Sequence, residues 1–289
     1  MDSTGISFTA LFTGHVWYEN GMSTRFFTSP RARLLYKAAQ PVERASQRLL
    51  GVTIHDILLQ RHHIIDHRID WLIKHEGVSQ ILEIACGYSP RGYKLSRKYP
   101  GLKYVEADLP HMAARKRALL QQHGGFGPDH QVVGCDVFDT GKPHGLDYVM
   151  NNVLDPSRPT LIITEGLVNY FRLSDISQVW RRLAQLGRTF PKAWYITDLV
   201  PKLKQPWAPL INAGTGMLAL ATRAHVNLHF RGSAQIEQGL RDCGFSKVVV
   251  FKPEQFQDIL PIPLPRTAAV AGKRANSIVR VVECQIHSE

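Results

Sequence analysis

The sequence predicts an α/β protein in which helices cover both faces of a largely parallel sheet. From Gln80 onward, short apolar runs alternate with stretches of helical spacing, which is typical of consecutive βαβ units. The first run leads into a tight turn of small residues, and the second ends in an acidic residue. The hydrophobic content of 44% is sufficient for the large core that such a sheet needs.

Residues 1–78 are predicted to form a helical N-terminal arm and cap. Ser29 followed by Pro30 is a helix start signal, and we expect a helix over Arg31–Arg48 despite Pro41. Apolar residues at helical spacing predict a second helix over Thr53–Glu76. An aromatic cluster upstream either packs the arm or covers a ligand as a lid, and it consists of Phe8, Phe12, Trp17, Tyr18, Phe26 and Phe27.

Residues 79–289 are predicted to form the sheet domain, with an insertion over residues 199–230. The expected strands are Gln80–Ala85, Lys103–Ala107, Gln131–Cys135, Thr160–Thr164, Ala193–Asp198, Lys247–Phe251 and Ser277–Cys284. The expected helices are Pro90–Lys98, Pro110–His123, Ser174–Leu186 and Ser233–Cys243, with another inside the insertion over Leu210–Thr222. No clear helix separates the last two strands, so we expect an antiparallel pair at one edge, joined by a proline-rich surface loop over Pro253–Lys273.

The turn after the first strand is the most informative local feature. Small residues at Ala85, Gly87 and Ser89 let the backbone come close to a ligand, and the N-terminus of the following helix offers free N–H groups. About twenty residues after Gly87, Asp108 ends the second strand, where a carboxylate can accept hydrogen bonds from ribose hydroxyls. Glu83, four residues before Gly87, makes the pattern more specific, because E-x-A-x-G-x-S resembles the first motif of class I S-adenosylmethionine-dependent methyltransferases, in which an acidic residue opens the turn. Together these residues predict a nucleoside-binding βαβ unit.

Four sequence blocks resemble the leucine carboxyl methyltransferase-like branch of class I S-adenosylmethionine-dependent methyltransferases. The blocks are Glu83–Gly92, Glu106–Pro110, Cys135–Val137 and Thr164–Phe171, and the stretch Thr13–Ser23 looks like the opening of one bacterial subgroup. The branch includes bacterial O-methyltransferases of polyketide biosynthesis. Over roughly residues 8–285, the resemblance implies a seven-stranded Rossmann-like sheet with S-adenosylmethionine as cofactor.

The resemblance implies roles for the residues that hold the adenosine half of the cofactor. Ala85 and Gly87 would line the methionine and ribose side, and Asp108 would hold the ribose hydroxyls. Asp136 would face the adenine amino group, and Val137 would lend its backbone N–H to the ring. Asp136 has a structural alternative, because an aspartate in this position can also cap a turn.

The resemblance also implies charged partners for the methionyl end. Glu165 would lie near the amino group, and Arg61 would pair with the carboxylate, for which Arg91 is a second candidate. A bidentate guanidinium suits a carboxylate, and a carboxylate suits an ammonium. Tyr170 and Phe171 either belong to the core or wall the sulfonium by cation–π contact.

The resemblance implies methyl transfer to an oxygen of a small molecule, in secondary metabolism. A carboxylate acceptor needs no base, whereas a hydroxyl needs one, for which His225 and His229 are candidates. Two alternatives remain open. The same fold could cyclise S-adenosylmethionine to azetidine-2-carboxylate and methylthioadenosine, or it could bind S-adenosylmethionine without catalysis.

Charge and composition argue against nucleic-acid binding, disulfides, a metal site and a membrane or secreted location for this chain. The net charge is +11, but Lys and Arg are dispersed and no RNA-recognition motif is present, so we expect no nucleic-acid partner. The four cysteines lie far apart, and His63 and His67 lack a third ligand, so we expect neither disulfides nor a metal site. Without a membrane-length apolar run or a signal-peptide layout, the expected location is cytoplasmic. The oligomeric state stays open.

Overall fold

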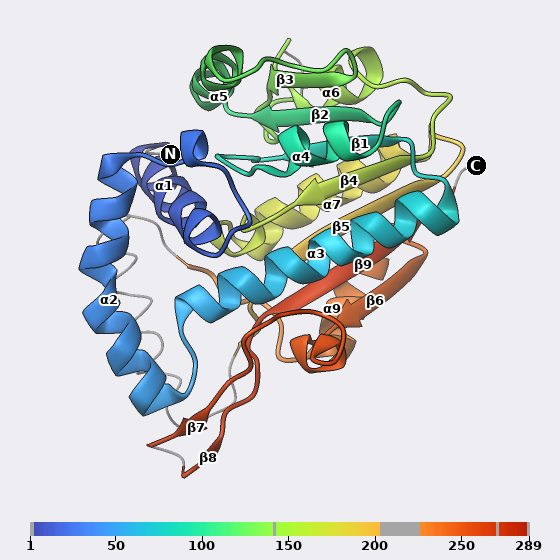
Figure 1. Cartoon of the computed structure of the whole chain (residues 1–289). Helices are drawn as coiled ribbons and strands as arrows, with labels where there is room; N and C mark the ends of the chain where they lie inside the picture. Colours follow the sequence, from blue (N-terminus) through green and yellow to red (C-terminus); the bar gives the residue numbers. More distant parts are fainter. Residues whose placement is uncertain (1–2, 141–142, 203–225, 270–271, 288–289) are drawn as a thin grey trace.

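The computed structural model describes residues 3–140, 143–202, 226–269 and 272–287. Within these residues, seven strands form a central sheet in the order β3-β2-β1-β4-β5-β9-β6 (Figure 1). Strands β1 to β5 run parallel, whereas β9 runs antiparallel to both of its neighbours, β5 and β6. The bounds are β1 (Gln80–Ile84), β2 (Lys103–Asp108), β3 (His130–Gly134), β4 (Thr160–Thr164), β5 (Ala193–Leu199), β6 (Lys247–Phe251) and β9 (Arg280–Ile286). The predicted Rossmann-like α/β sheet and its antiparallel edge pair are confirmed.

The helices begin and end where the local chemistry favours a boundary. Ser29 caps the start of α2, and Thr53 caps α3 in a reciprocal box with Asp56. Gly51 and Gly77 end these two helices with φ of 72° and 76°, a conformation that favours glycine. The helices are α1 (Ser3–Glu19), α2 (Pro30–Leu50), α3 (Ile54–Glu76), α4 (Arg91–Lys98), α5 (Pro110–Gln122), α6 (Leu146–Asn152), α7 (Leu173–Gly187) and α9 (Ser233–Arg241), with the 3-10 turns η1 (Arg25–Phe27), η2 (Val168–Tyr170) and η3 (Pro253–Phe256).

Alternation along β1 shows how the sheet divides the core into two layers. Leu82 and Ile84 pack with side chains of α6, α7 and α9 on one face of the sheet. Successive residues of a strand point to opposite faces, so Ile81 and Glu83 face α3 and α4, which lie across the other side (Figure 1). Glu83 is therefore buried on this face of the sheet, where a carboxylate needs a charged partner.

Three segments differ from the sequence-based expectations. The N-terminal arm forms a single helix, α1, which packs against α2 and α3. The short helix α6 was not expected, because its seven residues lack a capping side chain at Gly145. The expected loop Pro253–Lys273 contains η3 and a small hairpin of β7 (Thr267–Ala268) with β8 (Lys273–Arg274).

Most of the predicted insertion, with the expected helix Leu210–Thr222, lies outside the described residues. Among the helices that are described, none combines the length and apolarity needed to cross a membrane.

Candidate cofactor and acceptor site

Three adjoining cavities lie at the carboxyl edge of the sheet, where ligands bind in open α/β folds. The turn cavity is lined by Ile84, Ala85, Asp108, Leu109, Cys135, Asp136, Val137, Phe138, Leu167 and Phe171. The central cavity is lined by Thr9, Ala10, Thr13, Trp17, Arg61, Ala85, Cys86, Gly87, Tyr88, Asp108, Met112, Glu165, Gly166, Leu167 and Tyr170. The apolar cavity is lined by Thr9, Phe12, Thr13, Ile54, Ile57, Leu58, Arg61, Gly166, Leu167, Asn169, Tyr170, Asp198, Val200, Val226, Leu228 and Ile278.

The turn after β1 and the acid at the end of β2 meet where the turn and central cavities join. Ala85 has a φ of 55°, which is strained for a residue with a side chain, and Gly87 has a φ of 48°. Asp108 Oδ2 accepts the Gly87 N–H at 2.7 Å, and Oδ1 accepts the Leu109 N–H at 2.8 Å. Burial raises the pKa of Asp108, and these two N–H groups partly offset that rise. The carboxylate is therefore fixed in orientation beside both cavities.

The loop after β3 forms one wall of the turn cavity. Asp136 and Val137 both line it. Asp136 Oδ1 also accepts the Phe138 N–H at 3.0 Å, so this side chain caps its own turn while it lines the cavity. Phe138 meets the buried Phe171 edge-on at a centroid distance of 4.7 Å. An aromatic, largely apolar wall with one carboxylate suits a flat heterocycle that carries an amino group.

Arg61, on α3, lies between the central and apolar cavities and lines both. Its Nε donates to Glu165 Oε1 at 3.0 Å, and its Nη1 donates to Asp198 Oδ2 at 3.2 Å. The Arg61 side chain is 14% exposed, so part of it remains available to a ligand. Tyr170 lines the same two cavities, whereas Phe171 belongs to the turn cavity.

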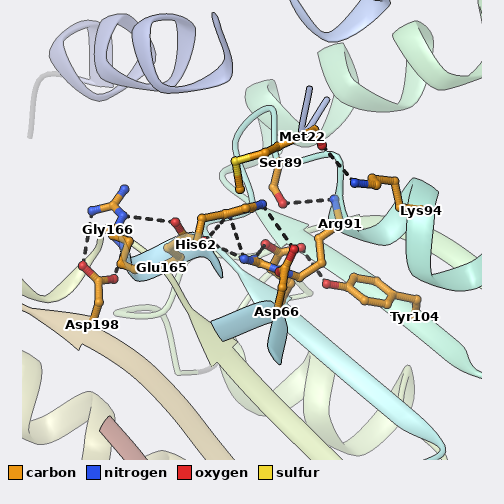
Figure 2. A network of polar contacts seen from close by, with 12 residues as sticks. Met22, His62, Asp66, Ser89, Arg91, Lys94, Tyr104, Glu165, Gly166 and Asp198 are labelled. Carbon is orange, nitrogen blue, oxygen red and sulfur yellow. Dashed lines mark hydrogen bonds and ion pairs between the residues drawn. The ribbon is translucent and has the colours of Figure 1, made fainter. Parts of the chain in front are cut away.

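Arg91, by contrast, lies behind the cavities in a buried polar network (Figure 2). Its guanidinium donates to Asp66 at 2.6 Å, to Glu83 at 2.6 Å and to Glu165 at 2.7 Å. The Arg91 side chain is fully buried, and neither Arg91 nor Glu83 lines any of the three cavities. Arg91 supplies the charged partner that Glu83 needs, and it links α3, β1, α4 and the end of β4.

The network gives the two acids beside Arg61 opposite ionisation behaviour. Burial alone would raise the pKa of Glu165, but His62, Arg91 and Arg61 hold it below the ordinary value. Burial raises the pKa of Asp198, and Arg61 opposes that rise without cancelling it. Glu165 is therefore a fixed anion, and Asp198 is the more readily protonated of the two.

Of the two histidines expected as a base, the structure describes only His229. His225 lies outside the described residues. His229 is half-buried beside Phe230, and burial lowers its pKa, but it lines none of the three cavities. No group of three or more metal-ligating side chains occurs in the described parts of the chain.

Sequence reasoning missed Asp198 and Asn169. Asp198 lies near the end of β5 and lines the apolar cavity, at the same sheet edge as Asp108 and Glu165; its place in the fifth strand was an available signal. Asn169 gave no such signal, because its role depends on tertiary contacts. Its side chain accepts the Val200 N–H at 2.7 Å and donates to Asn227 O at 2.6 Å, joining both stems of the insertion.

The strand order, the small-residue turn and the acid ending β2 define a class I S-adenosylmethionine-dependent methyltransferase. The model of the leucine carboxyl methyltransferase family matches residues 21–184, which is more than half of the chain. The protein belongs to this family.

Individual relatives are distant. Leucine carboxyl methyltransferase 1 of Eremothecium gossypii is 26% identical over 113 residues, covering 32% of this chain and 34% of the relative. A putative S-adenosylmethionine-dependent methyltransferase of Mycobacterium tuberculosis is 30% identical over 125 residues, covering 43% of this chain and 37% of the relative. The matched stretches thus span about a third of these curated relatives.

Solved structures share the fold over nearly the whole chain. A putative methyltransferase from Thermobifida fusca has a TM-score of 0.61 at 16% identity and covers 96% of this chain and 94% of its own. A DUF574 family protein from Streptomyces avermitilis has a TM-score of 0.60 at 15% identity, with 96% of each chain covered.

S-adenosylmethionine is the cofactor of this class, and the residues that line the cavities fit its chemistry. Asp108 offers two oriented oxygens next to a turn whose backbone can be approached closely. Arg61 and Glu165 place a cation and an anion at one end, as an amino-acid group requires. The turn cavity, with its aromatic wall, lies at the other end.

Gly166 lies against the Arg61 guanidinium, so the Gly166→Ala variant tests whether Arg61 holds the cofactor. A Cβ at Gly166 would lie 2.7 Å from Arg61 Nη2, and the φ of 67° is itself unfavourable for alanine. We expect the guanidinium to be displaced and the affinity for S-adenosylmethionine to fall roughly tenfold, the effect of losing one charge-assisted bond. Calorimetry measures the change. Gly127→Ala is the control, because nothing lies within 4 Å of its Cβ, and equal affinities of both variants would contradict the assignment.

Proposed function

We propose that the protein transfers the methyl group of S-adenosylmethionine to an oxygen of a small molecule in secondary metabolism. The observation that carries the proposal is the apolar cavity, which adjoins the central cavity through Arg61, Gly166 and Tyr170. A second molecule bound there would meet the methionyl end of the cofactor. An oxygen acceptor is supported by the name of the Eremothecium relative, a carboxyl methyltransferase. The role in secondary metabolism rests on the resemblance of the sequence blocks.

The proposed binding roles follow the cavity lining. Arg61 would hold the methionyl carboxylate, and Glu165 would face the amino group. Asp108 would hold the ribose hydroxyls, with Ala85 and Gly87 against the methionine and ribose. In the turn cavity, Asp136 and Val137 would contact adenine. Glu83 and Arg91 would support this site from behind rather than touch the cofactor.

The cofactor supplies an electrophilic methyl group on sulfur, so the protein mainly has to position the two reactants and exclude water. Helix α1 contributes to both tasks, because Thr13 and the buried Trp17 line the central cavity from the arm side. Tyr170 lines both cavities, where its ring can face the sulfonium and the acceptor.

Methyl transfer is favoured over cyclisation by the same cavity. Closing the methionyl chain on itself needs no acceptor, and it is favoured by a closed pocket beside the sulfonium. The apolar cavity instead offers a separate, largely aliphatic space next to Arg61. Binding without catalysis would not require that space either.

Incubation with S-adenosylmethionine alone, followed by mass spectrometry, tests the proposal. We expect the compound to bind in calorimetry and to remain intact until an oxygen acceptor is added. Formation of methylthioadenosine with a four-membered amino acid, without any acceptor, would make the protein a cyclase. An incubation without protein controls for spontaneous breakdown, which also releases methylthioadenosine.

A further inference from the structure

The apolar cavity is polar at one end and aliphatic elsewhere. Its polar groups cluster at the boundary with the central cavity, around Arg61 and Asp198. The rest of the described lining is largely aliphatic or aromatic, supplied by Phe12, Ile54, Ile57, Leu58, Val200, Val226, Leu228 and Ile278. A ligand that fits this lining has an apolar body and one polar group directed at the methyl donor.

The charges at the polar end distinguish between acceptor types. Among the described lining residues, Arg61 is the only cation, and it is bonded to Glu165 and Asp198. If Arg61 also holds the methionyl carboxylate, no cation remains for a second carboxylate among the lining residues that the structure describes. An anionic acceptor would also lie beside Asp198, whose side chain is only 4% exposed, and like charges repel strongly at such depth.

A neutral hydroxyl, in contrast, finds a partner in Asp198. The Asp198 carboxylate accepts the Gly166 N–H at 2.6 Å through Oδ1 and the Arg61 Nη1–H at 3.2 Å through Oδ2. A carboxylate has about four lone-pair sites, so these two bonds orient it and leave capacity for another donor. Asp198 is thus held rigidly at the wall that an acceptor would touch.

We propose that the acceptor is a neutral hydroxyl on an apolar body and that Asp198 takes its proton. This inference rests on the proposed function. The hydroxyl oxygen forms the new O–CH₃ bond, and the S–CH₃ bond breaks with its electron pair remaining on sulfur. The O–H proton passes to the Asp198 carboxylate, so the products are a methyl ether, S-adenosylhomocysteine and a protonated Asp198, which then releases its proton to solvent.

The pH dependence of the reaction has a defined sign. The groups that face Asp198 are Arg61 from α3, Glu165 after β4 and the Gly166 N–H. Burial raises the pKa of Asp198 above its ordinary value despite Arg61. Because the base must be ionised, kcat/KM should fall as the pH drops through that raised pKa. Asp198→Asn should abolish this acid limb.

A matched pair of probes, para-propylphenol and para-propylbenzoate, tests the inference at neutral pH. The two share one apolar body, but only the benzoate is charged. We expect the phenol to bind the S-adenosylhomocysteine complex at least tenfold more tightly in calorimetry. In Asp198→Asn, the difference in affinity between the phenol and the benzoate should narrow, because the carboxylate that repels the benzoate is gone. With S-adenosylmethionine, mass spectrometry should find para-propylanisole, and Asp198→Asn should lower kcat, measured at saturating S-adenosylmethionine, about 10²- to 10⁴-fold.

Each opposite outcome counts against the inference. Tighter binding of the benzoate, formation of its methyl ester, or a phenol rate unchanged in Asp198→Asn would overturn it. Binding of neither probe at millimolar concentration would overturn the assignment of the cavity. Failure of the proposed function looks different, because the protein would then either not bind S-adenosylhomocysteine or consume S-adenosylmethionine without any probe.

Discussion

Replacing Arg91 with leucine is expected to lower the free energy of unfolding by about 3–5 kcal/mol, the typical effect of removing one partner from a buried ion pair. The substitution would leave Glu83 and Glu165, both almost fully buried, without the guanidinium that bridges them. Glu165 would keep Arg61 and His62, whereas Glu83 would keep, among the described side chains, the Tyr104 hydroxyl at 2.8 Å. Most of the lost stability should therefore come from the unpaired Glu83 carboxylate.

Urea unfolding measures this change, and Arg97→Leu is the matched control. Arg97 lies on the same helix but is exposed, with its guanidinium over the Tyr93 ring, so we expect less than about 1 kcal/mol. Although burial opposes it, ion pairing depresses the pKa of Glu165 in the folded state. Pairing thus stabilises the fold above the ordinary glutamate pKa and is lost as the pH falls toward the depressed value. The difference in free energy of unfolding between wild type and Arg91→Leu should therefore narrow as the pH falls. A difference that stays constant with pH would contradict this account.

Replacing Asp108 with alanine is expected to weaken S-adenosylmethionine binding at least tenfold. A hydrogen bond to a charged group contributes about 1.5–3 kcal/mol, so losing one ribose bond already corresponds to tenfold, and losing two to about a hundredfold or more. The variant would also free the Gly87 and Leu109 N–H groups that the carboxylate now anchors. The lost ribose bonds and the loosened turn should both lower the affinity for S-adenosylmethionine.

Calorimetry with purified protein tests this prediction, with Asp155→Ala as the control. Asp155 precedes β4 at the opposite edge of the sheet, where its carboxylate accepts hydrogen bonds from Ser157 and pairs with Arg158. We expect its removal to leave the affinity unchanged. If Asp108→Ala, still folded by its melting temperature, binds S-adenosylmethionine as well as wild type does, the ribose assignment is wrong.

The sheet was predictable because each strand is a short apolar run with a clear stop. Thr160–Thr164 and Lys247–Phe251 have the expected bounds, since β-branched residues dominate both. Helix α6 was not predictable, because its stability comes from burying Leu146, Val149 and Met150 rather than from a local signal. The β7–β8 hairpin was equally hidden, because its strands are only two residues long.

The clustering of the proposed cofactor residues at one edge of the sheet follows from the sequence, but which of them line the cavities does not. The motif that contains Glu83 and Arg91 was visible in the sequence, yet only side-chain direction shows that both point toward α3 rather than into a cavity. The place of Asp198 near the end of a strand was visible in the sequence, but its closeness to Arg61 was not, because that closeness depends on how α3 crosses β5. Contacts between distant elements decide these roles, and no local pattern encodes them.

The position of β9 has a consequence for how the protein is made. Strand β9 lies between β5 and β6, so β6 has no other partner in the sheet and β5 keeps an open edge until β9 is added. Since Arg280–Ile286 is synthesised last of the seven strands, a nascent chain on the ribosome carries an open edge on β5, and later an unpaired β6, until β9 has been made. Unpaired edges of this kind promote aggregation. Expression yield should therefore depend strongly on chaperone capacity and on the growth temperature of the host.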